Sequence, residues 1–176
     1  QYHTSRPMRD TVYVAERKLA LLKREGRALA SASHPPPPPY RAADSRVPRH
    51  VQLYGETFAL HECPGDGSCF YHAVAHGMTR RHPGSAWDAA RVRRATARGH
   101  IRSGDEERAV RARATSAWAD DRDVQATANA LGVEIRVWES ANVMWISFCP
   151  ASTTSGLPAI LLHNTGNVHF DALSVL

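Results

Sequence analysis

The sequence predicts an α+β fold for residues 51–176, with a central, mostly antiparallel sheet flanked by helices. Apolar residues recur at helical spacing between residues 69 and 131, whereas short segments rich in β-branched residues follow residue 132. Gly132 separates the two regions and is a plausible helix stop. Helices followed by a run of strands are typical of an α+β domain, because alternating βαβ units would mix the two along the chain.

Residues 1–50 differ from the rest of the chain. Residues 9–32 carry apolar residues near a 3.6-residue period, which predicts an amphipathic helix. Five consecutive prolines at positions 35–39 then predict an extended polyproline spacer. We therefore expect 1–50 to be a helical appendage with a Pro-rich spacer, and 51–176 to be the functional domain.

The first half of residues 51–176 is expected to be largely helical. An extended segment within 51–63 leads to a turn with Gly65 and Gly67, and apolar residues after Cys69 then follow helical spacing. Ser85 is expected to cap the next helix, with Asp88 in the manner of a capping box, and this helix should run to near Ile101. Two further helices are expected over residues 106–118 and 121–131.

The second half is expected to be a meander of strands. Alternating and β-branched segments predict four of them, at residues 133–139, 143–148, 159–163 and 168–176. The loop 164–167 would lead into the last strand, which carries two residues of chemical interest.

Charge and hydropathy exclude several classes of function. The net charge is +5, yet residues 1–50 hold ten Lys or Arg against four Asp or Glu, and residues 51–176 hold twelve against thirteen. A near-neutral domain argues against a nucleic-acid binder. No apolar run approaches the roughly 18–20 residues that span a bilayer, and no signal peptide is visible. We expect neither nucleic acid nor membrane as a partner.

The turn before Cys69 suggests thiol chemistry. A thiolate is the reactive form of cysteine, and the N–H groups of a helix N-terminus stabilise it. Cys69 is expected in the first turn of a helix, where backbone N–H groups could also bind an oxyanion. The chain has three cysteines, Cys63, Cys69 and Cys149, which is no disulfide framework and favours a reducing compartment.

A base and an orienting carboxylate are expected near the C-terminus. His169 and Asp171 are two residues apart on a predicted strand, so their side chains share a face, whereas Phe170 points the opposite way into a core. The carboxylate can then accept a hydrogen bond from one imidazole nitrogen, which leaves the other nitrogen for Cys69. Nucleophile, base and orienter are the minimum set for thiol-based acyl transfer.

These segments resemble the ovarian tumour (OTU) family of cysteine proteases. Asp66-Gly67-Ser68-Cys69-Phe70-Tyr71 is similar to the family's Asp-Gly-Asn-Cys-(Leu/Phe)-(Phe/Tyr) signature, with Ser68 where Asn is common. Val168-His169-Phe170-Asp171 is similar to its C-terminal His-(Phe/Tyr)-(Asp/Asn) box. The resemblance covers roughly residues 51–176 and is strongest to viral OTU domains.

The resemblance implies a papain-like deubiquitinase that cleaves bonds after the C-terminal glycine of ubiquitin or a ubiquitin-like modifier. It implies Cys69 as nucleophile, His169 as general base, Asp171 as orienting carboxylate and Asp66 as part of the oxyanion-hole turn. It implies no metal and no organic cofactor. We expect a viral or bacterial protein that acts in the host cytoplasm. A viral polyprotein-processing protease and a catalytically silent ubiquitin-binding module remain as alternatives.

Overall fold

The computed structural model describes residues 49–115, 117–151, 158–165 and 169–176. The helix expected at residues 9–32 and the polyproline spacer at 35–39 lie outside the described residues. Within the described part, no helix is both long enough and apolar enough to cross a membrane.

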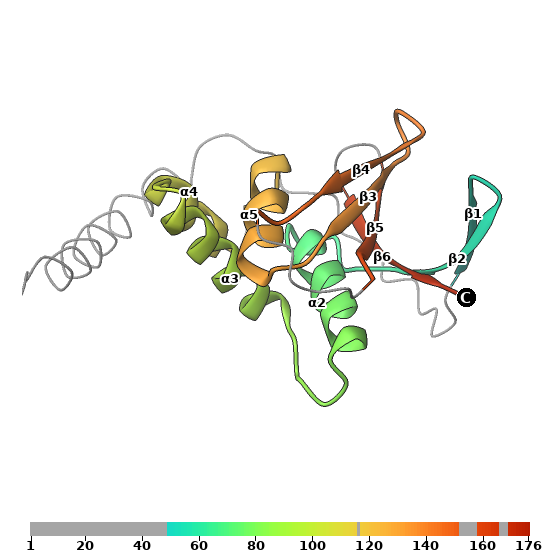
Figure 1. Ribbon diagram of the computed structural model, residues 1–176, viewed down its shortest axis with the longest axis horizontal. Helices are drawn as coiled ribbons and strands as arrows, with labels where there is room; N and C mark the ends of the chain where they lie inside the picture. Colours follow the sequence, from blue (N-terminus) through green and yellow to red (C-terminus); the bar gives the residue numbers. More distant parts are fainter. Residues whose placement is uncertain (1–48, 116, 152–157, 166–168) are drawn as a thin grey trace, which may run out of the picture. The chain divides into compact units, whose positions relative to one another are not determined.

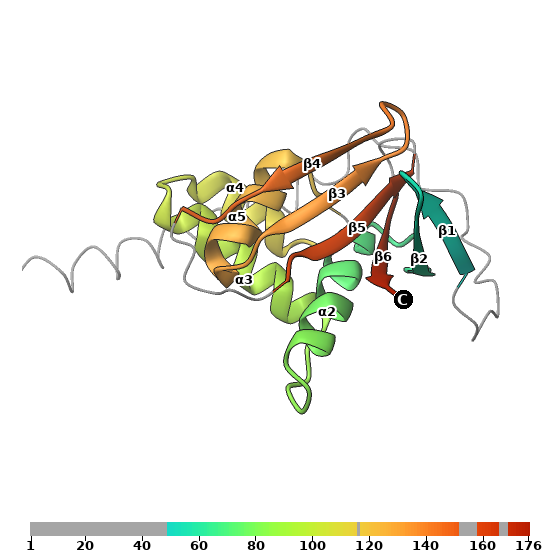
Figure 2. The same ribbon diagram turned by 45° about the vertical axis from the view of Figure 1, so that its right-hand side comes forward.

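The centre of the fold is a six-stranded sheet in the order β1-β2-β6-β5-β3-β4, which Figure 2 shows from one edge strand to the other. Its strands are β1 (Arg49–Leu53), β2 (Glu56–His61), β3 (Ile135–Glu139), β4 (Met144–Phe148), β5 (Ile160–Thr165) and β6 (His169–Val175). All neighbouring pairs are antiparallel except β3 and β5, which are parallel. The α+β fold and the mostly antiparallel sheet are confirmed.

The strands do not form the expected meander, because β5 lies beside β3 rather than beside β4. The β3–β4 hairpin instead occupies the edge of the sheet. Ile135 of β3 is fully buried, whereas three of the five residues of β4 are half-buried and two are exposed. The more deeply buried strand β3 takes the inner position next to β5.

Four helices gather on one side of the sheet (Figure 1). They are α2 (Cys69–Arg81), α3 (Ala89–Arg102), α4 (Glu106–Arg113) and α5 (Asp121–Leu131). The expected position of Cys69 in the first turn of a helix is confirmed, because α2 begins at this residue. So is the end of α5, since Gly132 adopts a left-handed φ of 65° and ends the helix.

Two helix boundaries were predicted wrongly. α3 begins at Ala89 because Asp88, and not Ser85, is its N-cap and accepts the N–H of Arg91. α4 ends at Arg113 rather than Trp118. The backbone carbonyls that follow it turn toward a buried guanidinium, described below, instead of continuing the helix.

The main core lies between α2 and the inner strands. Phe70 and Val74 of α2 pack there with Ile160, Phe170 and other buried residues. Gly77 makes the close approach of helix and sheet possible, because a Cβ atom at this position would lie 2.6 Å from Cγ2 of Ile160. Helix α2, which begins with Cys69, is thereby fixed against β5 and β6.

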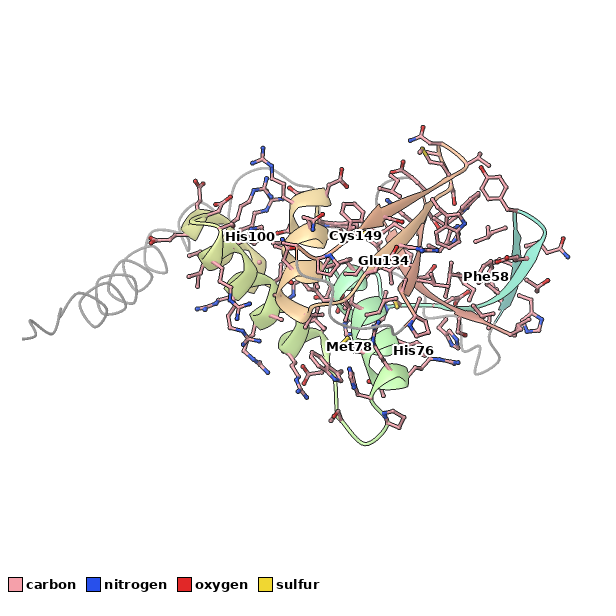
Figure 3. All side chains as sticks on the ribbon, in the orientation of Figure 1. Phe58, His76, Met78, His100, Glu134 and Cys149 are labelled. Carbon is pink, nitrogen blue, oxygen red and sulfur yellow. The ribbon has the colours of Figure 1, made fainter. Side chains whose placement is uncertain are left out.

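A second apolar cluster covers the other face of the sheet. The ring of Phe58 on β2, labelled in Figure 3, meets Trp145 of β4 at 5.9 Å, and Tyr54 meets Trp138 of β3 at 5.1 Å. The strands involved lie toward opposite ends of the strand order, so the sheet must curl to bring them together. This curl encloses the small cluster of Leu53, Phe58, Leu60, Trp138 and Leu173.

A histidine pair between α2 and β2 predicts acid sensitivity. The rings of His76 and His61 are 4.1 Å apart, and burial lowers the pKa of His76 to about 4, helped by the charges of His61 and Arg80. The unfolded chain, with a histidine pKa of about 6.5, binds the proton first, so stability is lost as the pH falls from about 6.5 toward about 4.

We expect the loss in Tm between pH 7 and pH 4.5 to be smaller in His76→Gln than in the parent protein, measured by calorimetry. His82→Gln changes an exposed histidine just after the same helix and serves as the control. Equal acid losses in the parent and His76→Gln would contradict the assignment.

Candidate active site

The turn before α2 is held by its own side chains. Asp66 Oδ1 accepts the N–H of Ser68 at 2.8 Å, and Asp66 Oδ2 lies 3.6 Å from Nε2 of His72. Gly67 has a φ of 79°, a conformation that other residues rarely adopt. Gly65, the other glycine of this turn, is not among the glycines with positive φ.

Cys69 is the first residue of α2 and is 2% exposed. The first hydrogen bond of the helix runs from the N–H of His72 to the carbonyl of Ser68. The N–H groups of the first turn have no partner within the helix, so the positive end of the helix dipole lies at the sulfur. The sequence prediction for Cys69 is confirmed in its position.

β6 brings His169 and Asp171 together as expected from strand alternation. Nε2 of His169 lies 2.9 Å from Oδ1 of Asp171. Phe170 points into the core, where its ring is 5.4 Å from that of Phe70 on α2. The same aromatic contact thus ties the histidine strand to the cysteine helix.

Asp171 is buried and is itself held in place. The backbone N–H of Cys63 donates to its Oδ1 at 2.8 Å. The carboxylate therefore receives hydrogen bonds from a fixed backbone group and from His169. An orienting carboxylate needs this restraint in order to fix the imidazole ring.

The electrostatics of His169 favour its protonated form. The hydrogen bond that His169 donates to the Asp171 carboxylate raises the pKa of His169 to about 10. A hydrogen bond with Cys69 acts in the same direction, and burial opposes both. Because Nε2 faces Asp171, Nδ1 is the nitrogen available to the sulfur. An imidazolium that faces a thiol group is the arrangement that activates cysteine nucleophiles.

The other two cysteines differ from Cys69. Burial raises the pKa of Cys63 to about 12, with the Asp171 carboxylate adding to the effect, so this thiol stays protonated. Cys149 is exposed after β4, where Figure 3 labels it. All three thiols are free.

Two further residues near the site were not predicted from the sequence. His163 of β5 lies directly across from Asp171 in the strand register, and its Nε2 is 2.7 Å from Ser140 Oγ. Arg93 of α3 contacts the turn before Cys69. The sequence around each residue does not mark it as part of a functional site. A histidine on a strand and an arginine on a helix are usually structural or exposed.

The described residues hold no group of three His, Cys, Asp or Glu side chains that could bind a metal ion. Two acidic stretches lie at the starts of α4 and α5, where they cap the helices. Asp105 accepts the N–H of Arg108, and Asp120 forms a capping box with Asp123.

Comparison with known proteins shows the fold. No protein-family profile matches the chain, and no curated protein matches it by sequence. Among solved structures, an Ovarian Tumor (OTU) domain in complex with ubiquitin matches with a TM-score of 0.56 and 18% identity, covering 71% of this chain and 76% of that one.

Two more solved structures extend the likeness. The Hazara virus OTU bound to ubiquitin has a TM-score of 0.53 and 20% identity over 76% of this chain and 93% of its own. An OTU deubiquitinase from Wolbachia pipientis wMel has a TM-score of 0.50 and 18% identity over 67% and 88%. The described domain therefore has the OTU fold that the sequence motifs predicted.

Proposed function

We propose that this chain is a thiol-dependent deubiquitinase that hydrolyses isopeptide or peptide bonds at the C-terminal glycine of ubiquitin or a ubiquitin-like modifier. One observation carries the proposal. Cys69, His169 and Asp171 stand in hydrogen-bonded sequence on an OTU fold. Solved examples of that fold include domains bound to ubiquitin.

In the acylation step the Cys69 sulfur attacks the carbonyl carbon of the glycine. A carbon–sulfur bond forms and the carbonyl becomes an oxyanion. The carbon–nitrogen bond then breaks, and the departing amine takes its proton from His169. The raised pKa of His169 keeps that proton in place until the amine needs it.

In the second step water replaces the thioester. Neutral His169 accepts a proton from the water as the oxygen attacks the thioester carbon. The carbon–sulfur bond breaks, and the glycine leaves as a carboxylic acid that loses its proton to the solvent. Cys69 returns as the thiolate and His169 in its protonated form, which is the starting state. Asp171 keeps the ring oriented in both steps.

The turn at Asp66 is suited to bind the oxyanion. Its carboxylate already accepts the N–H of Ser68, so that N–H is not a free donor. The N–H of Cys69 has no partner within α2. The N–H of Asp66 lies at the start of the turn that the Asp66 side chain holds in place. We propose these two backbone groups as the donors, with the Asp66 side chain setting their geometry.

We further propose a viral or bacterial source and action in the host cytoplasm. Structures of viral and bacterial OTU domains are among those that match this fold, and the three free thiols are compatible with a reducing compartment. The hydrogen bonds among Cys69, His169 and Asp171 argue against a silent binding module, which would have no need of them.

A panel of di-ubiquitins of each linkage, together with linear fusions of ubiquitin-like modifiers, tests the proposal by gel. We expect cleavage of at least one ubiquitin linkage. Binding without cleavage would indicate the silent module. Cleavage of the inactive Cys69→Ala chain, added to the panel as a substrate, with all ubiquitin substrates intact, would indicate polyprotein processing. Both outcomes contradict the proposed function.

The pH dependence should report the Asp171–His169 bond. His169 must be protonated to supply the amine, so kcat/KM is expected to fall as the pH rises through about 10. Asp171→Asn removes the main cause of the raised pKa. We expect its alkaline limb to move to lower pH by about one unit or more. An alkaline limb at the same pH in both proteins would contradict this account.

A further inference from the structure

Arg93 of α3 is a buried cation whose partners are all uncharged. Its side chain is 3% exposed, although arginine is almost never fully buried without a carboxylate partner. The two terminal nitrogens bond the carbonyls of Gly67 (3.0 Å), Ala112 (3.1 Å), Ala114 (2.6 Å), Thr115 (3.1 Å) and Ala117 (3.3 Å), and Ser68 Oγ (3.0 Å).

These contacts join three segments around the nucleophile. Gly67 and Ser68 are the two residues immediately before Cys69. The other carbonyls belong to the end of α4 and the stretch after it, which is why α4 stops early. The guanidinium carbon also lies over the ring of Tyr71, in the first turn of α2, at 3.9 Å from the ring centroid.

Ser68 shows what these contacts do to the start of α2. A serine at an N-cap usually accepts a hydrogen bond from the second or third N–H of its helix. Ser68 occupies the N-cap position but makes no such bond. Its hydroxyl accepts from Arg93 and donates to the carbonyl of Thr115. The side chain is thereby kept away from the N–H groups beside Cys69.

We propose that Arg93 is a positioning residue of the active site, which fixes the Gly67–Ser68 backbone and holds the Ser68 hydroxyl away from the free N–H groups in the first turn of α2. This inference rests on the proposed function. Arg93 touches neither the sulfur nor the substrate in this role. It acts by fixing where the Cys69 sulfur and the neighbouring N–H groups lie before the reaction begins.

A guanidinium suits the task better than an ammonium group. Its planar fork can bond two carbonyl-bearing segments at once and still stack on an aromatic ring, whereas lysine presents a single point charge. Arg93→Lys therefore keeps the charge and loses the bridge, and Arg93→Gln loses both. A positioning role predicts that the two variants fail in the same way.

The matched control is Thr127→Val. The Thr127 hydroxyl is buried between α3 and α5, 2.6 Å from Thr96 Oγ1, and donates to the carbonyl of Asp123. Its loss lowers stability without touching the turn before Cys69. Comparison with this control separates an effect on stability from an effect on the site.

The experiment measures kcat and KM for a ubiquitin–fluorophore amide, well below the lowest Tm of the set. We expect Arg93→Lys and Arg93→Gln to lower kcat about tenfold or more and to change KM by less than about threefold. Thr127→Val should keep kcat within about twofold even if its Tm falls as far. Wild-type kcat in a folded Arg93→Lys protein would overturn the proposal.

Alkylation of Cys69 by iodoacetamide gives a readout that needs no ubiquitin. We expect the rate to fall about threefold or more in both Arg93 variants and to be unchanged in Thr127→Val. If the parent protein cleaves no ubiquitin substrate, the proposed function fails, yet the alkylation rates still test Arg93. Equal alkylation rates in all four proteins would overturn the role of Arg93 alone.

Ser68→Ala tests the positioning role of Arg93 in a second way, which can be used if the Arg93 variants fail to fold. It removes the hydroxyl that Arg93 holds and leaves the Gly67 bond in place. We expect kcat to fall about threefold or more at nearly unchanged Tm, since the turn loses one of its two bonds to the guanidinium. Wild-type kcat in Ser68→Ala would contradict the claim that the bond between Arg93 and the Ser68 hydroxyl helps to fix the turn.

Discussion

Replacing Cys69 with alanine is expected to lower the hydrolysis of ubiquitin conjugates by about 10⁴-fold or more, because no other group near the site can form the thioester. Burial raises the pKa of Cys63 to about 12, and Cys149 is exposed after β4. The measurement is kcat/KM on a ubiquitin–fluorophore amide.

Cys63→Ala and Cys149→Ala are the controls for this prediction. Cys63 contributes its backbone N–H to Asp171, which the substitution keeps, so we expect activity close to that of the parent protein. If Cys69→Ala still turns over substrate while Cys63→Ala does not, the nucleophile has been assigned to the wrong residue.

Replacing His169 with alanine is expected to remove activity almost as completely as losing Cys69, because a nucleophile and its base act as a unit. Asp171→Ala should lose less and leave measurable turnover, since Asp171 orients the ring and transfers no proton. Asp171→Asn should lie between Asp171→Ala and the parent protein, because the amide can keep part of the orientation.

The ranking of these variants decides the roles. Initial rates for all three should be taken at a pH where the parent protein is fully active. Parent-like kcat/KM in Asp171→Ala would move the orienting role to Asn167 or Asp66. Substantial turnover in His169→Ala would remove the base from the mechanism.

The arrangement of the candidate site could be predicted from sequence because its geometry is local. A glycine with positive φ before a helix fixes Cys69, and the alternation of a strand places His169 and Asp171 on one face. Both relations are set within a few residues. The pairing of the two segments, one hundred residues apart, required the family resemblance in addition.

The features that were missed depend on contacts between distant segments. Arg93 sits on a helix like other arginines, and only the fold brings the carbonyls of Gly67 and Ala114 to it. The early end of α4 follows from the same contacts. The parallel pairing of β3 with β5 depends on which strand is buried deepest, which a strand's own sequence does not specify.

The most direct test of the account is the reaction of the protein with ubiquitin that carries an electrophile in place of its C-terminal carboxylate. Intact mass spectrometry should show one added ubiquitin per chain, and peptide mapping should place the bond on the Cys69 sulfur. Cys69→Ala should give no adduct, whereas Cys63→Ala and Cys149→Ala should react as the parent does. A folded parent protein that forms no adduct, or forms one at another cysteine, would contradict the central claim.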